Sequence, residues 1–313
     1  MHQVLGAIRG VDVSVYEFLS RFAGHWMLDR LVAQEEANSL LKGALFFAIY
    51  WYVWFSPAVD QPRRRRAVIA VLTASILAIV VARSIAFMVP FRLRPIYDPV
   101  VTHPHYSIPV TVNIENWSAF PSDTASFFFA LAVGVAYFLR RLTIPIILFA
   151  LGWICLPRLY LGLHYASDVI VGIAIGATMV WISLKSTLIQ SMIASRLLAV
   201  MEAKPHWFYP GAFLVSFEMA TFFEESRRAG RAILHMALAS LHRSPGAAST
   251  PLDEWAGLVL TAGLLLAAAW VAFVLKERPR HDRASVARGS RVKLLGNRCP
   301  DNTNPALRGA IKP

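Results

Sequence analysis

Cysteine is almost absent from this chain, with Cys155 and Cys299 the two cysteines in 313 residues. Cys155 falls inside an apolar stretch and Cys299 lies in the C-terminal tail, so the pair indicates neither a disulfide framework nor a zinc site. Apart from one His-x3-Asp pair, no histidines and aspartates show the spacing of metal ligands. We therefore expect no metal and no other cofactor.

Charged residues are also scarce. Asp, Glu, Lys and Arg make up 16% of the sequence, whereas 56% of the residues are hydrophobic and the mean hydropathy is +0.50. This composition excludes an ordinary soluble domain. We expect an all-α integral membrane protein, a polytopic helical bundle of about six or seven spans of roughly 20 residues each. The apolar stretches are Leu40–Pro57, Ala67–Phe91, Thr124–Leu139, Leu142–Leu156, Asp168–Leu184 and Trp255–Leu275.

Acidic residues are outnumbered by basic ones, and the net charge is +12. In a soluble protein this excess would suggest a nucleic-acid partner. Here the basic residues cluster in short loops between apolar stretches, so we expect no nucleic acid and interpret the clusters as topology signals that face the cytoplasm. The loops 92–121 and 157–167 then face outward. The clusters are Arg63–Arg66, Arg140–Arg141 and Lys185.

The two ends of the chain differ from the apolar middle. Asp12 and Glu17 interrupt residues 1–36, which therefore look like an amphipathic helix at the membrane surface and not like a signal peptide. Residues 276–313 contain ten Lys/Arg and three Asp/Glu, so this segment is predicted to be a disordered basic tail near anionic lipid heads. A membrane core over 37–185 and further helices over 186–275 complete the predicted organisation.

Within this last region, residues 207–223 have two interpretations. They can cross the membrane as a short sixth span, or they can lie flat as an amphipathic helix. A cytoplasmic tail requires an additional crossing between Lys185 and Trp255, which favours the span.

A polar tetrapeptide, Pro121-Ser-Asp-Thr124, precedes an apolar run. Ser122 or Asp123 can cap a helix there, because the first N–H groups of a helix lack intrahelical partners. The same groups form a binding site for anions, so capping and phosphate binding are both compatible with the sequence.

The outward loops carry further polar residues near membrane depth, where charged groups usually mark a site. His164 and Asp168 are four residues apart and share one face if both lie at a helix start. A carboxylate on one ring nitrogen leaves the other nitrogen available for chemistry, but an ordinary interfacial hydrogen bond fits equally well. Arg158 offers a planar fork that suits phosphate oxygens.

Three motifs in order, "PFRLRP", "AFPSDTA" and "PRLYLGLHYASDVIVG", resemble those of the type 2 phosphatidic acid phosphatase and haloperoxidase superfamily. Its members carry Lys-x6-Arg-Pro, Pro-Ser-Gly/Asp-His and Ser-Arg-x5-His-x3-Asp motifs. The similarity covers roughly residues 40–185, and the third motif is the most specific.

The resemblance implies a metal-free phosphoryl-transfer site. His164 would attack phosphorus and form a phosphohistidine, and Asp168 would orient His164 and stabilise its charge. A group of side chains and N–H groups would bind the phosphate: Arg94, Arg158, Ser122, Asp123 and Thr124.

The sequence departs from these motifs at two functional positions. Phe87 stands where the family has lysine, and Arg83 or Arg92 can restore the charge; we favour Arg83 over the alternative that it only extends toward lipid headgroups. Thr124 stands where the family has the histidine that protonates the leaving oxygen. Threonine cannot supply that proton near neutral pH, which favours a lipid diphosphate whose leaving group needs no proton. His103 and His105 are candidate substitutes.

The expected function is hydrolysis of a lipid phosphate or polyprenyl diphosphate, similar to undecaprenyl diphosphate, in the outer leaflet of a bacterial inner membrane. The alternatives are a phosphotransferase that uses a sugar or lipid hydroxyl, and a catalytically silent relative that binds lipid phosphates. A transporter is disfavoured because few charges lie away from the outer face. Nothing in the sequence indicates an oligomeric state.

Overall fold

The computed structural model describes residues 2–107, 118–224 and 226. The chain divides into two compact units, residues 1–268 and 269–313, and all of the described residues lie in the first. The predicted span Trp255–Leu275 and the predicted basic tail lie outside the described residues.

The described part is helical and contains no strand, which confirms the all-α prediction for these residues. Its elements are α1 (His2–Ser20), α2 (Trp26–Ala37), α3 (Ser39–Phe55), α4 (Gln61–Met88), η1 (Pro95–Tyr97), α5 (Asp123–Phe138), η2 (Arg140–Leu142), α6 (Thr143–Phe149), η3 (Ala150–Cys155), α7 (Leu156–Tyr160), α8 (Ala166–Lys185), η4 (Ile189–Ala194), α9 (Ser195–Ala203) and α10 (Pro205–Ala220).

Within the described residues, three helical segments are long and apolar enough to cross a membrane. They are α4, the continuous segment Arg140–Tyr160 and α8. Two shorter apolar helices, Leu40–Phe55 and Asp123–Phe138, coincide closely with two further predicted spans. These helices are compatible with an integral membrane protein, and a total of six or seven spans stays a prediction.

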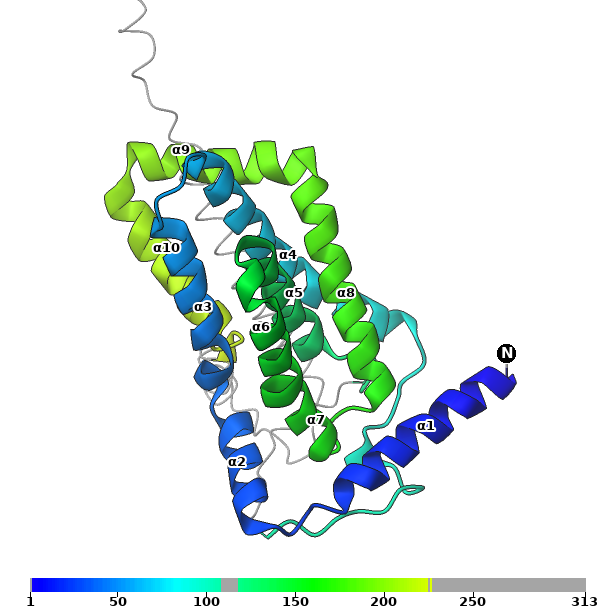
Figure 1. The fold of residues 1–313 in the computed structure, drawn as a ribbon. Helices are drawn as coiled ribbons and strands as arrows, with labels where there is room; N and C mark the ends of the chain where they lie inside the picture. Colours follow the sequence, from blue (N-terminus) through cyan, green and yellow to red (C-terminus); the bar gives the residue numbers. More distant parts are fainter. Residues whose placement is uncertain (1, 108–117, 225, 227–313) are drawn as a thin grey trace, which may run out of the picture. The chain divides into compact units, whose positions relative to one another are not determined.

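Helix α5 lies at the centre of the described bundle. It packs against α4, α6 and α8, which surround it in Figure 1. Its first ten residues, 123–132, are all buried, including Asp123, Thr124 and Ser126. A helix that is apolar around its whole circumference is stabilised by neighbours on every side. The polar start of α5 is therefore enclosed by protein.

Two glycines allow α8 to approach α5 closely. A Cβ added at Gly172 would lie 2.4 Å from Ser122 O, and one at Gly176 would lie 2.3 Å from Ser126 O. Any larger residue would overlap the α5 backbone at these positions. The close approach brings the start of α8 against the start of α5, where two of the motifs lie.

The N-terminal segment, predicted as one amphipathic helix over 1–36, forms two helices separated by a turn. Gly24 in that turn has φ +88°, in the left-handed region that favours glycine. Helix α1 contacts α7 and α8, and α2 contacts α3 and α7. The segment exposes large apolar side chains, including Val11, Phe18 and Trp26, while Asp12 and Glu35 are buried. Its buried acidic side chains therefore face the rest of the protein.

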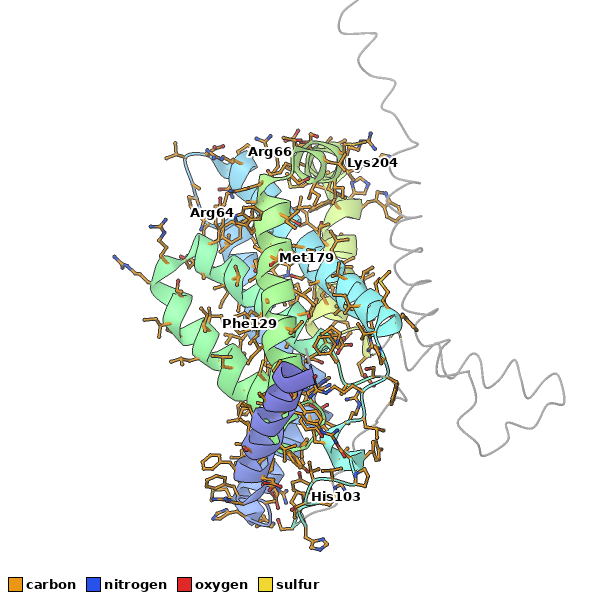
Figure 2. All side chains as sticks on the ribbon, turned by 90° about the vertical axis from the view of Figure 1, so that its right-hand side faces the viewer. Arg64, Arg66, His103, Phe129, Met179 and Lys204 are labelled. Atoms are coloured by element: carbon orange, nitrogen blue, oxygen red, sulfur yellow. The ribbon has the colours of Figure 1, made fainter. Side chains whose placement is uncertain are left out.

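The predicted span over 207–223 corresponds to α10, which packs against α3. Trp54 and Phe208 stack in this contact with ring centroids 5.8 Å apart. Figure 2 shows Arg64, Arg66 and Lys204 at one end of the described helices and His103 at the opposite end. The arginine cluster and the loop that carries His103 are thus separated by the length of the bundle, as the predicted topology requires.

Candidate active site

Backbone hydrogen bonds join the three motif segments at the starts of α5 and α8. The Ala119 N–H donates to Arg92 O at 2.9 Å, which connects the first motif to the second. The Ser122 N–H donates to Asp168 O at 3.1 Å, which connects the second motif to the third. Because both bonds are between backbone groups, they fix the relative positions of the segments. The motifs form one site.

His164 lies in the loop between α7 and α8 and is 2% exposed. Its Nδ1 is 2.7 Å from Ala119 O, so Nδ1–H donates to this carbonyl. The other ring nitrogen, Nε2, is buried and has no hydrogen-bond partner among the described residues. Burial lowers the pKa of His164 well below its ordinary value, and the charges of Arg94 and Arg158 lower it further, against an opposing effect of Asp123. The ring is therefore neutral near pH 7, with its lone pair on Nε2.

Asp168 does not form the expected hydrogen bond with His164. Its carboxylate accepts from the Tyr165 N–H at 2.7 Å and from Arg92 Nη1, and it is fully buried. The physical reason is its position in the first turn of α8, where it caps the helix. His164 precedes Ala166, the first residue of that helix, so the two side chains do not share a helical face. A backbone carbonyl, not Asp168, orients the imidazole.

Two of the predicted phosphate-binding arginines flank His164. Arg94 Nη1 donates to Leu163 O at 3.0 Å, directly beside the histidine in the chain. Arg158 Nη1 pairs with Glu36 Oε1, and its Nε is buried without a hydrogen-bond partner in the part of the chain that the structure describes. The structure places these two positive charges near the imidazole, and their binding of phosphate stays a prediction.

Of the two arginines considered as substitutes for the family's lysine, Arg83 reaches the second motif. Its Nη2 is 2.5 Å from Asp123 Oδ2, whereas Phe87 is 72% exposed. Arg92 instead pairs with Asp12 and Asp168. Arg92 therefore connects structural elements, and Arg83 points to the candidate site.

The PSDT tetrapeptide caps α5, as the first interpretation proposed. Ser122 Oγ accepts from the Ala125 N–H at 3.3 Å. The Thr124 N–H donates to Asp123 Oδ1 at 2.8 Å, so this N–H, a predicted phosphate ligand, is bonded within the segment. Ser122 and Thr124 are both buried. An incoming phosphate has to displace the Asp123 carboxylate from Thr124 to use that N–H.

The two substitute histidines lie on the surface. His103 and His105 are both exposed, and Figure 2 shows the His103 side chain pointing outward at the end of the molecule. His164, by contrast, is buried. The structure does not bring either loop histidine to the imidazole of His164.

Sequence reasoning missed a set of charged groups from the N-terminal helices. Glu36 of α2 bonds Arg158, and Lys42 Nζ of α3 is 2.8 Å from Glu36 Oε2. Burial alone would raise the pKa of Glu36, but Arg158 and Lys42 lower it to about 2. Glu35 is buried beside Lys42, and its burial raises its pKa to about 7. The signal available in the sequence was charge balance, because carboxylates are rare in this chain and buried arginines need counter-charges.

Residues 68–190 match the family model described as the PAP2 superfamily. Neither the curated proteins nor the solved structures contain a match to this chain. The matched range includes α5, α8 and all three motifs, and it begins after the N-terminal helices that carry Asp12 and Glu36. This region is therefore similar to the PAP2 superfamily, and the similarity supports phosphatase activity on phosphate esters as the function to be tested.

Proposed function

We propose that this protein is a membrane-embedded phosphatase that hydrolyses a lipid phosphate or polyprenyl diphosphate through a phosphohistidine on His164. One observation carries the proposal: His164 has Nδ1 bonded to a backbone carbonyl and Nε2 buried without a partner among the described residues, next to Arg94 and Arg158. A neutral imidazole of fixed tautomer is a nucleophile. Positioned cations stabilise the charge of a phosphoryl group during transfer.

In the proposed reaction, the Nε2 lone pair attacks phosphorus and the bond to the leaving oxygen breaks. Arg94 and Arg158 stabilise the negative charge on the three remaining phosphoryl oxygens. Water then attacks the phosphohistidine, the P–N bond breaks, and inorganic phosphate is released. The arginines supply the positive charge in both steps.

Thr124 favours a substrate with a good leaving group. Its hydroxyl donates to Asp123 at 3.5 Å and does not ionise near neutral pH. A phosphate leaving group departs without a proton more easily than an alkoxide does. Polyprenyl diphosphates are therefore the first candidate substrates, ahead of phosphatidic acid, phosphatidylglycerophosphate and lipid A phosphates.

We place the reaction in the outer leaflet. His103 lies opposite Arg64 and Arg66 in Figure 2, and its loop connects the first motif to the second in the chain. Arginine-rich loops stay preferentially in the cytoplasm. The exposed apolar side chains of α1 and α2 are then available to the lipid interface near the site.

The test is phosphate release from a panel of lipid phosphates and diphosphates by purified protein in mixed micelles. We expect release by the wild type, none by His164→Asn, and unchanged release by His103→Ala, which alters an exposed histidine. Labelled phosphate should be trapped on the wild type as a base-stable, acid-labile adduct. Equal release by His164→Asn and the wild type would reject the mechanism. Transfer of phosphate to an added alcohol would indicate a phosphotransferase. Binding of the lipid phosphate without turnover would indicate a catalytically silent relative.

A further inference from the structure

This inference concerns the proton of the leaving oxygen and rests on the proposed function. An alkoxide leaving group needs a general acid, which typically contributes about 10²- to 10⁴-fold to the rate. Thr124 does not ionise near neutral pH, and His103 and His105 are exposed. His164 itself is occupied as the nucleophile. For the lipid phosphate monoesters among the proposed substrates, whose leaving group is an alkoxide, the proton donor has to be another group that lies beside the imidazole.

Asp123 occupies such a position. It is the first residue of α5, and its side chain is 12% exposed. The segment that leads into Asp123 also supplies Ala119 O, the acceptor of the His164 Nδ1–H. One short stretch of backbone therefore places both the nucleophile and this carboxylate.

The contacts of Asp123 keep its carboxylate in a defined orientation. Oδ1 accepts from the Thr124 N–H at 2.8 Å, and Oδ2 pairs with Arg83 Nη2 at 2.5 Å. The charged and titratable groups that act on it include Arg83 of α4, Arg158 of α7 and His164. In the absence of substrate these arginines stabilise the ionised form of Asp123.

We propose that Asp123 is the proton carrier of the reaction. As His164 Nε2 bonds to phosphorus and the P–O bond breaks, the protonated Asp123 carboxyl transfers its proton to the leaving oxygen and becomes a carboxylate. The carboxylate then removes a proton from water, the water oxygen bonds to phosphorus, and the P–N electron pair returns to Nε2. Phosphate leaves and the Asp123 carboxyl is regenerated.

The substrate itself supplies the condition for protonating Asp123. A phosphoryl dianion that binds Arg94 and Arg158 brings negative charge next to the carboxylate. Like charges at short distance disfavour the ionised form, so proton uptake accompanies phosphate binding. Without substrate, the pair with Arg83 orients the Asp123 carboxylate. Substrate binding then favours the protonated form of Asp123.

Glu36 is the competing carboxylate, and its contacts make it a poorer donor. Each of its oxygens bonds a cation, Arg158 on one side and Lys42 on the other. The charge of Asp123, but not that of Glu36, is among the main influences on the His164 imidazole. Both oxygens of Glu36 are therefore occupied by its ion pairs with Arg158 and Lys42.

The first experiment compares leaving groups. Asp123→Asn keeps an oxygen that can accept from the Thr124 N–H while removing the proton donor. We expect it to lose about 10²- to 10⁴-fold in kcat on an alkyl phosphate, and much less on p-nitrophenyl phosphate, whose leaving group needs no proton. Glu36→Gln should change both substrates by the same factor. Equal losses on both substrates by Asp123→Asn, or a leaving-group-dependent loss in Glu36→Gln instead, would overturn the proposal.

The second experiment measures proton uptake and needs no turnover, so it separates this inference from the proposed function. Sulfate is a tetrahedral dianion that takes no proton itself near neutral pH. Calorimetry in buffers of different ionisation enthalpy should show uptake of roughly one proton per sulfate by the wild type and by His164→Asn. Asp123→Asn should bind sulfate without uptake. Uptake that disappears in His164→Asn and persists in Asp123→Asn would assign the proton to the imidazole and refute the role of Asp123.

Discussion

His164 and Ala119 are joined by a hydrogen bond of 2.7 Å between the imidazole Nδ1 and a backbone carbonyl oxygen. This bond leaves the lone pair on the buried Nε2. Because the acceptor belongs to the backbone, no side-chain substitution at residue 119 removes it. The orientation of the candidate nucleophile depends on the position of the segment that leads into α5. It therefore also depends on how α5 packs.

The depressed pKa of His164 predicts a pH-dependent contribution to stability. Below about pH 6.5, the ordinary pKa of histidine, the unfolded chain takes up a proton at residue 164 that the folded chain excludes. The free energy of unfolding should therefore fall with decreasing pH by up to about 1.4 kcal/mol per pH unit from this residue. Denaturant unfolding in detergent at pH 5 and 7 should show a smaller loss in His164→Asn than in the wild type.

The comparison with His164→Asn is necessary because Glu35 changes the free energy of unfolding with pH in the opposite direction to His164. Its pKa is raised to about 7, so the folded chain binds a proton there between the ordinary pKa of glutamate, about 4.3, and pH 7. That uptake stabilises the fold as the pH decreases. If the free energy of unfolding decreased equally between pH 7 and pH 5 in the wild type and in His164→Asn, the predicted contribution of His164 would be contradicted.

Gly172→Ala should separate α8 from α5. The added Cβ would lie 2.4 Å from Ser122 O, so the two helices have to move apart and shift the second motif. We expect a loss of about 1–3 kcal/mol in stability and a lower rate of phosphate release. Gly152→Ala is the matched control, because nothing lies within 4 Å of a Cβ at that position. Similar Tm values for the two variants would show that the close approach of α8 and α5 is not required.

Asp168→Ala should affect stability more than the chemical step. The carboxylate caps α8 and pairs with Arg92, and its removal leaves buried donors unsatisfied at a cost of about 1–3 kcal/mol. Asp60→Ala, which removes the exposed cap of α4, serves as the control with a cost of about 1 kcal/mol. If Asp168→Ala left Tm unchanged while kcat fell more than about 100-fold, within the range of a general acid–base residue, a direct role at His164 would be indicated.

Glu36→Gln should strengthen anion binding. The substitution removes the negative charge that pairs with Arg158, so an incoming phosphate no longer competes with it. We expect the loss of this competition to lower the inhibition constant for inorganic phosphate roughly fivefold, which corresponds to about 1 kcal/mol. Glu202→Gln, an exposed residue of α9, should leave that constant unchanged. Weaker inhibition of Glu36→Gln by phosphate would show that Glu36 assists binding.

Local pattern was sufficient for several features of this protein. Hydropathy predicted both ends of α8 to within two residues and those of α4 to within six, because apolar runs of this length form membrane helices. The resemblance of the third motif to the superfamily pattern implied that His164 is the nucleophile and that Arg158 binds the phosphoryl group. Both kinds of signal depend on residues that are neighbours in the sequence, so they can be recognised without knowing the fold.

The sequence by itself determined an apolar helical chain with a phosphatase motif set. The tertiary structure decided which groups contact which: Ala119 O on His164, Arg92 on Asp168, and Glu36 on Arg158. Each of these contacts joins segments that are distant in the chain, and each depends on how closely helices pack. Which carboxylate pairs with which arginine depends on distance and burial in the assembled helices. Neither quantity can be obtained from the spacing of residues along the chain.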